Sequence, residues 1–182
     1  MKTALCPLLL AASVPILFGS SPSAIAEDES AHPPTGLVRT VLQSTGRFQD
    51  PEAAIAEGYR PGPSCASGPI EGAMGVHFAN ESLIGDGVLD AAQPEILVYE
   101  PMPSGRLRLV AVEYLVLAEA WHASNPEPPV LEGQLFHHIG APNRLGLPAL
   151  YELHVWAWKN NPHGMFVDWN PRVTCEHFVP AG

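Results

Sequence analysis

Two apolar runs in the second half of the chain have the pattern of buried β-strands, and each carries ionisable residues near its centre. The first covers residues 107–118 (LRLVAVEYLVLA), with Glu113 in the middle. The second covers residues 149–159 (ALYELHVWAWK), with Glu152 and His154 two positions apart. A carboxylate among apolar side chains is costly unless it is paired, protonated or bound to a cation. The pattern therefore predicts a polar site in the interior of a domain.

Two further segments are predicted to be strands. Residues 95–101 are joined to the run at 107–118 by the turn sequence MPSG, which predicts a β-hairpin. Residues 74–80 (MGVHFAN) predict a short strand in which His77 lies between apolar neighbours.

Helical patterns come earlier in the chain. Thr35 is a plausible N-cap for a helix over residues 36–45, whose apolar residues fall on one face. Asp50 and Pro51 predict the start of a second helix, which Gly58 would end.

Long connections separate these elements, and most of the 20 prolines lie in them. Residues 60–75, 119–131 and 132–148 are predicted to be loops rich in Gly, Pro or Ser. The predicted fold class is α+β, with two N-terminal helices packed on a mostly antiparallel sheet, long Pro/Gly-rich loops and one disulfide.

Alternation along a strand predicts which side chains share a face. On the run at 107–118, Leu109, Ala111 and Glu113 are expected on one side. On the last run, Glu152 and His154 are expected to project together.

The N-terminus has the features of a processing segment. Met1-Lys2 precedes a mostly apolar stretch over residues 8–18, which is short for a membrane span, and residues 23–26 (SAIA) fit a cleavage site. We therefore predict a signal peptide over residues 1–26, a disordered leader over 27–34 and a single domain over 35–182, in the periplasm or secreted. The alternative is an uncleaved anchor. No second segment is long enough to insert in a membrane after cleavage.

Charge and cysteine content narrow the choice of partner and compartment. The formal net charge of −10 argues against nucleic acid and anionic membrane surfaces as partners. After cleavage only Cys65 and Cys175 remain, and in an exported chain they predict a disulfide. The alternative is a pair of thiolate metal ligands.

Three of the predicted strands offer metal-ligand side chains. His77, Glu113 and His154 make a set that suits a mononuclear site for Zn²⁺, Fe²⁺ or Cu²⁺ with positions open to a small ligand. His137 is a candidate fourth ligand, and Glu152 is a candidate general base or a partner of a ligand.

No motif of diagnostic spacing, such as H-E-x-x-H, supports the metal site. Without a metal, His77 and His154 would be core histidines, and Glu113 would pair with an arginine such as Arg60 or Arg144.

Two other functions are consistent with the pattern. Trp156, Trp158 and Trp169, with Tyr99 and Tyr114, could line an apolar pocket of a metal-free small-molecule-binding module. Alternatively, the chain could be an envelope structural or interaction protein whose polar cluster only fixes the fold. The sequence does not decide whether the protein is an enzyme.

Several segments carry a family resemblance. FQDPEAAIAEGYRP, GAMGVHFAN, PEILVYEPMPSGRLRLVAVEYLV and YELHVWAWKNNPHGMFVDWNPRVTC resemble a family of small exported bacterial proteins of unknown function. The resemblance covers roughly residues 35–175 and implies one exported domain. It assigns no activity, cofactor or site residue.

Overall fold

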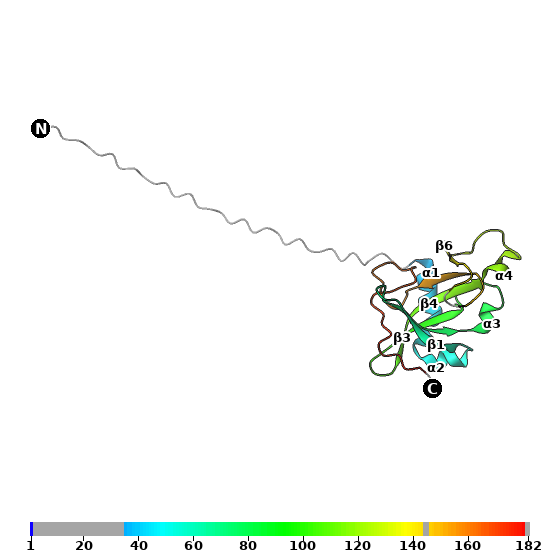
Figure 1. The fold of residues 1–182 in the computed structure, drawn as a ribbon, viewed down its shortest axis with the longest axis horizontal. Helices are drawn as coiled ribbons and strands as arrows, with labels where there is room; N and C mark the ends of the chain where they lie inside the picture. Colours follow the sequence, from blue (N-terminus) through cyan, green and yellow to red (C-terminus); the bar gives the residue numbers. More distant parts are fainter. Residues whose placement is uncertain (2–34, 144–145, 181–182) are drawn as a thin grey trace. The chain divides into compact units, whose positions relative to one another are not determined.

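A six-stranded antiparallel sheet, in the order β1-β2-β3-β4-β8-β7, is the main element of the structure (Figure 1). A second sheet consists of two short strands, β5 and β6. The strands are β1 (Arg60–Ser67), β2 (Ala73–Ala79), β3 (Ile96–Pro101), β4 (Leu107–Leu117), β5 (Val130–Leu131), β6 (Gln134–Leu135), β7 (His137–Ile139) and β8 (Leu150–Val155).

The computed structural model describes residues 1, 35–143 and 146–180. The chain divides into two units, Met1–His32 and Pro33–Gly182, and every element named here belongs to the second. The predicted signal peptide and leader, Met1 excepted, lie outside the described residues, as does Arg144.

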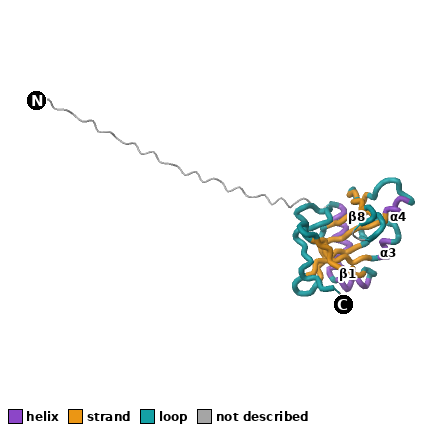
Figure 2. Tube along the Cα trace, viewed as in Figure 1, coloured by secondary structure: helices purple, strands orange, loops and turns teal. Residues whose placement is uncertain are grey.

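The other regular elements are short helices, drawn in purple in Figure 2. They are α1 (Gly36–Thr45), the 3-10 helix η1 (Gly46–Gln49), α2 (Pro51–Ala56), α3 (Glu81–Ile84) and α4 (Ala118–His122). Side chains cap the first two α-helices, because Thr35 Oγ1 accepts from Val38 N at 3.3 Å and Asp50 Oδ1 accepts from Glu52 N at 3.1 Å. With an antiparallel sheet, a few helices and one disulfide, the structure agrees with the predicted α+β class. Within the described part of the chain, no helix has the length and apolarity needed to cross a bilayer.

The main sheet buries side chains on both faces. One face belongs to a core cluster that includes Leu37 and Val41 of α1, Phe48 of η1 and Ala54 of α2, and we call it the helix-side cluster. The other face belongs to a second cluster, formed by Ala73, Ile96, Val98, Val110, Ala111, Leu115, Leu150, Trp156 and Val173. On β8, Glu152 and His154 alternate with the buried positions of the helix-side cluster and therefore point to this second face.

A β-bulge on β4 changes the predicted alternation. Val98 pairs with Ala111 and Tyr99 pairs with Leu109, so Val110 is an extra residue. Because one inserted residue reverses the alternation, Leu109 belongs to the helix-side cluster while Ala111 remains on the opposite face. The prediction that Leu109 shares a face with Ala111 and Glu113 was wrong for this reason.

The segment predicted as a loop over residues 60–75 contains strand β1 and the start of β2. Its prolines and glycines are poor strand formers, but β1 is an edge strand, and its register shifts between Pro61 and Cys65. Edge strands tolerate proline because one side of the backbone needs no partner. Long-range pairing with β2 thus overrides the local composition.

Other element boundaries also differ from the predictions. Strand β8 ends at Val155 rather than at Lys159, because Trp156 N donates to Met165 O at 3.0 Å and Trp158 N donates to Val110 O at 3.2 Å. The segments predicted as loops over 119–131 and 132–148 contribute most of α4 and all of β5, β6 and β7. These are short elements stabilised by tertiary contacts, and the local pattern does not reveal them.

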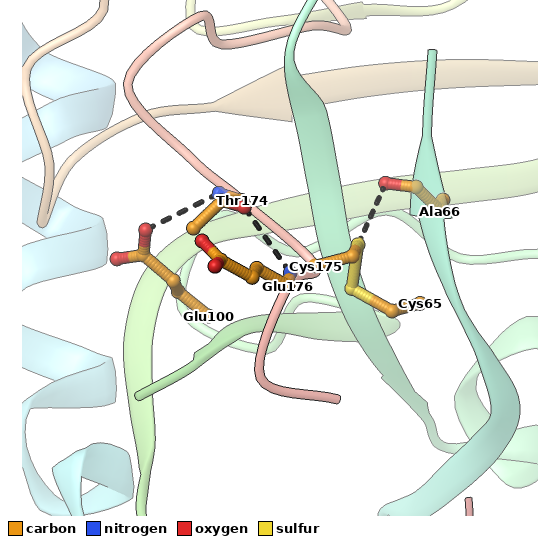
Figure 3. Close-up of a disulfide and its surroundings, with 6 residues drawn as sticks. All are labelled: Cys65, Ala66, Glu100, Thr174, Cys175 and Glu176. Carbon is orange, nitrogen blue, oxygen red and sulfur yellow. Dashed lines mark hydrogen bonds between the residues drawn. A yellow bond between two sulfur atoms is a disulfide. The ribbon is translucent and has the colours of Figure 1, made fainter. Parts of the chain in front are cut away.

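The predicted disulfide is present between Cys65 on β1 and Cys175 in the C-terminal tail, across a separation of 110 residues (Figure 3). Beside it, Thr174 N donates to Glu100 Oε1 at 3.4 Å. Glu100 also accepts hydrogen bonds from Lys159 Nζ, at 2.7 Å to each carboxylate oxygen, and from Arg108 Nη2. The tail is therefore attached to the sheet both covalently and through a buried carboxylate.

Candidate metal centre

Strand register brings His77, Glu113 and His154 to one place on the sheet. Glu113 on β4 is directly opposite His154 on β8. His77 lies on β2, two strands from β4, and its neighbour in the register is Val98 on β3. Neighbouring strands are about 4.8 Å apart, so the imidazole and the carboxylate meet by reaching across β3.

A glycine allows β2 to approach β3 closely just before His77. Gly75 has φ +125, and a Cβ atom there would lie 2.5 Å from Tyr99 O. Only glycine accommodates both the positive φ and this approach. The position of His77 relative to β3 therefore depends on Gly75.

The distances among the three side chains suit ligands of one ion. His77 Nε2 lies 3.3 Å from Glu113 Oε2, and His154 Nε2 lies 3.6 Å from the same oxygen. One donor atom from each of the three residues lies within 4.8 Å of the others. Ligands at about 2.1 Å from a tetrahedral ion are separated by roughly 3.4 Å, which is close to these spacings. The structure thus brings together the three residues that the sequence selected.

His154 is buried without the hydrogen bonds that its ring requires. Its side chain is 1% exposed, and neither Nδ1 nor Nε2 has a hydrogen-bond partner among the residues that the structure describes. A buried polar atom without a partner costs about 1–3 kcal/mol. Such an atom calls for an explanation. A metal ion that binds the lone pair of one ring nitrogen would be such an explanation.

The electrostatics favour the deprotonated forms that bind metals. Burial lowers the pKa of the His154 imidazole more than the neighbouring Glu113 and Asp168 raise it. Burial would raise the pKa of the Glu113 carboxyl, but a proton on the neighbouring His154 or His77 and the hydrogen bonds from His77 and Glu152 hold that pKa below its ordinary range; a bound cation would take the place of that proton. A neutral imidazole and an ionised carboxylate are the ligand forms of both groups.

A second group, Glu152, His154 and Asp168, lies on the other side of the His154 ring. Asp168 Oδ1 is 3.7 Å from His154 Nδ1 and 3.0 Å from His137 Nδ1. His137, predicted as a fourth ligand, is therefore in contact with Asp168, and it is not a member of either three-residue group among the described residues.

A cavity of about 430 Å³ opens beside the three residues. Its wall includes residues 62–67 of β1, together with Met74, Ile96, Leu115 and Leu147. His77, Glu113, Glu152 and His154 contribute the ionisable part of the lining. The described lining residues include no tryptophan or tyrosine, so the predicted aromatic pocket does not form here. A small ligand that enters the cavity would meet the candidate metal site at its polar end.

The ion pair between Glu113 and Arg60, which was predicted for a metal-free site, does not form. Arg60 Nη1 donates to Ile55 O at 2.7 Å and to Tyr59 O at 2.8 Å, so its guanidinium is used by the backbone. Glu113 lies beside His77 and His154 instead.

Sequence reasoning did not select Asp168. It lies in the non-repetitive segment after β8, where no periodicity marks it, and it reaches the site only because the chain folds back over the sheet. The tripeptide Asp168-Trp169-Asn170 carries no recognisable ligand spacing.

Comparison with protein-family models, with curated proteins and with solved structures found no match for this chain.

Proposed function

We propose that this protein is an exported, disulfide-bonded domain that binds one divalent transition-metal ion through His77, Glu113 and His154. The observation that carries the proposal is the buried His154 ring. Its two nitrogens lack hydrogen bonds within the described part of the chain, and one donor atom each from Glu113 and His77 lies near the ring. Export is supported by the disulfide, since such bonds persist in oxidising compartments. Membership of the family of small exported bacterial proteins is part of the same proposal.

Two nitrogen ligands and one carboxylate suit Zn²⁺, Fe²⁺ or Cu²⁺ and leave coordination positions open. Those positions would face the cavity, where a small ligand can bind to the ion or be activated by it. If the ion activates water, the ionised Glu152 carboxylate is the candidate base, because it lines the same cavity; that role requires Glu152 to give up the proton that it donates to Glu113.

The direct test is elemental analysis of protein purified without a metal-affinity tag. We expect about one equivalent of Zn, Fe or Cu, or uptake of one equivalent when the metal-free protein is mixed with each ion. A metal concentration of about 100 times Kd should stabilise the fold by about 2.7 kcal/mol, measurable as a rise in Tm.

The variant Glu113→Gln keeps the shape of the side chain and removes its charge, so metal affinity should fall more than about 100-fold. His163 is an exposed histidine outside the cluster. The matched control His163→Ala should therefore bind metal like the unchanged protein. Failure of the unchanged protein to bind Zn²⁺, Fe²⁺ and Cu²⁺ would overturn the proposal and favour a metal-free binding module or a structural protein.

A further inference from the structure

Polar side chains lie at both nitrogens of the His154 ring, and each side can accept the single proton of a neutral imidazole. His77 and Glu113 face its Nε2 atom, and Asp168 faces its Nδ1 atom. A neutral imidazole has one lone pair and one N–H, so it binds a metal through one nitrogen while the other donates a hydrogen bond. His154 therefore has two tautomers with different consequences, and only one leaves Nε2 free to bind an ion.

Asp168 lies where it can favour the His154 tautomer that carries its proton on Nδ1. The separation of 3.7 Å from His154 Nδ1 exceeds hydrogen-bond length, so a hydrogen bond between them requires the two groups to approach by about 0.5 Å. The Asp168 side chain is 24% exposed, so it keeps partial contact with water. The same oxygen, Oδ1, lies 3.0 Å from His137 Nδ1, and this contact fixes the position of the carboxylate.

Glu113 favours the other tautomer, in which Nε2 carries the proton. Its oxygen lies 3.6 Å from His154 Nε2 and would accept a proton carried there. That hydrogen bond would use one lone pair of the Glu113 oxygen and would place a proton on the nitrogen that the metal needs. An acceptor at Nδ1 shifts the proton away from this side of the ring.

We propose that Asp168 is a positioning residue: it accepts the Nδ1–H of His154 and so directs the Nε2 lone pair toward the metal site, with His137 anchoring Asp168. This inference rests on the proposed metal-binding function. It gives His137 a role in holding a carboxylate in place of the role of a fourth ligand. Carboxylates that orient a ligating histidine in this way raise metal affinity about 10–100-fold.

The first test reads the tautomer itself in the metal-free protein. Two-bond ¹H–¹⁵N correlation spectra of ¹⁵N-labelled protein assign which nitrogen of His154 carries the proton. We expect Nδ1–H in the unchanged protein and a shift of population to Nε2–H in Asp168→Ala. A carboxylate that serves only packing would not change this tautomer. A proton found on Nε2 in the unchanged protein overturns the inference without any variant.

The second test measures affinity for Zn²⁺ by competition with a chromophoric chelator. Asp168→Ala should weaken binding about 10–100-fold. Asp168→Asn keeps one acceptor oxygen and the side-chain shape, so it should recover part of that loss. Glu127→Ala removes one exposed carboxylate and serves as the control for net charge.

The outcomes separate the two claims. Absence of Zn²⁺, Fe²⁺ and Cu²⁺ binding in the unchanged protein overturns the proposed function. Metal binding that is equal in the unchanged protein and Asp168→Ala, with the same His154 tautomer in both, overturns only the role of Asp168. A loss in His137→Ala larger than that in Asp168→Ala identifies His137 as a direct ligand and also overturns the inference.

Discussion

Glu95 should make the stability of the fold fall as the pH rises through neutrality. Its side chain is 1% exposed, and Oε2 accepts a hydrogen bond from Leu115 N at 3.1 Å. Burial, assisted by the charges of Asp86 and Glu113, raises the pKa of this carboxyl from 4.5 to about 8 against the effect of backbone hydrogen bonds. The folded protein therefore holds a proton that the unfolded chain releases.

The sign follows from proton binding in the two states. Between pH 4.5 and about 8 the folded state binds more protons at Glu95 than the unfolded state does. Stability then decreases with rising pH by up to about 1.36 kcal/mol per pH unit. Between about pH 5.5 and about pH 7.5 the loss from this one group is about 2.5 kcal/mol.

The perturbation is Glu95→Gln, which cannot ionise and keeps an oxygen for Leu115 N. Urea unfolding followed by tryptophan fluorescence gives the free energy of unfolding of both proteins at each pH. The free energy of the variant relative to the unchanged protein should rise by about 2.5 kcal/mol over this pH range. Groups common to both proteins cancel in the difference.

Glu127→Gln makes the same chemical change at an exposed site and should give a difference that does not depend on pH. A Glu95→Gln difference that stays constant within about 0.5 kcal/mol would refute the reasoning, because Glu95 would then titrate alike in both states.

Two further predictions concern the attachment of the C-terminal tail. Replacing both Cys65 and Cys175 by serine should lower the free energy of unfolding by about 4–5 kcal/mol, since the bond closes a loop over a separation of 110 residues; an unchanged urea midpoint would contradict this. Glu100→Gln should destabilise the fold by about 2 kcal/mol at neutral pH, because it removes the charge that accepts from Lys159 and Arg108. Burial would raise the pKa of Glu100, but hydrogen bonds from Lys159 and Arg108 lower it, so this contribution is present above pH 4.5 and is lost as the pH falls through the folded pKa. Acid unfolding curves of the two proteins should converge at low pH, and a constant gap down to the acid limit would count against the ion pair.

The local sequence determined the elements whose signals lie within a few residues. The cap at Thr35, the turn between β3 and β4, and the long apolar run around Glu113 all act through neighbouring residues, and the structure has an element at each place. The prediction of a buried polar site also came from local pattern, since a carboxylate inside an apolar strand has few low-energy environments.

Only tertiary structure decided the features that depend on pairing between distant segments. Strand β1 forms from Gly, Pro and Ser because β2 supplies its partners, and the bulge at Val110 sets which side chains of β4 share a face. Asp168 lies near His154, and His137 contacts Asp168, and both come from segments with no periodic signal. The sequence names His77, Glu113 and His154 as groups that can ligate a metal, but their separations of 3–4 Å arise from strand register, and Asp168 joins them only through the return of the chain; both are non-local.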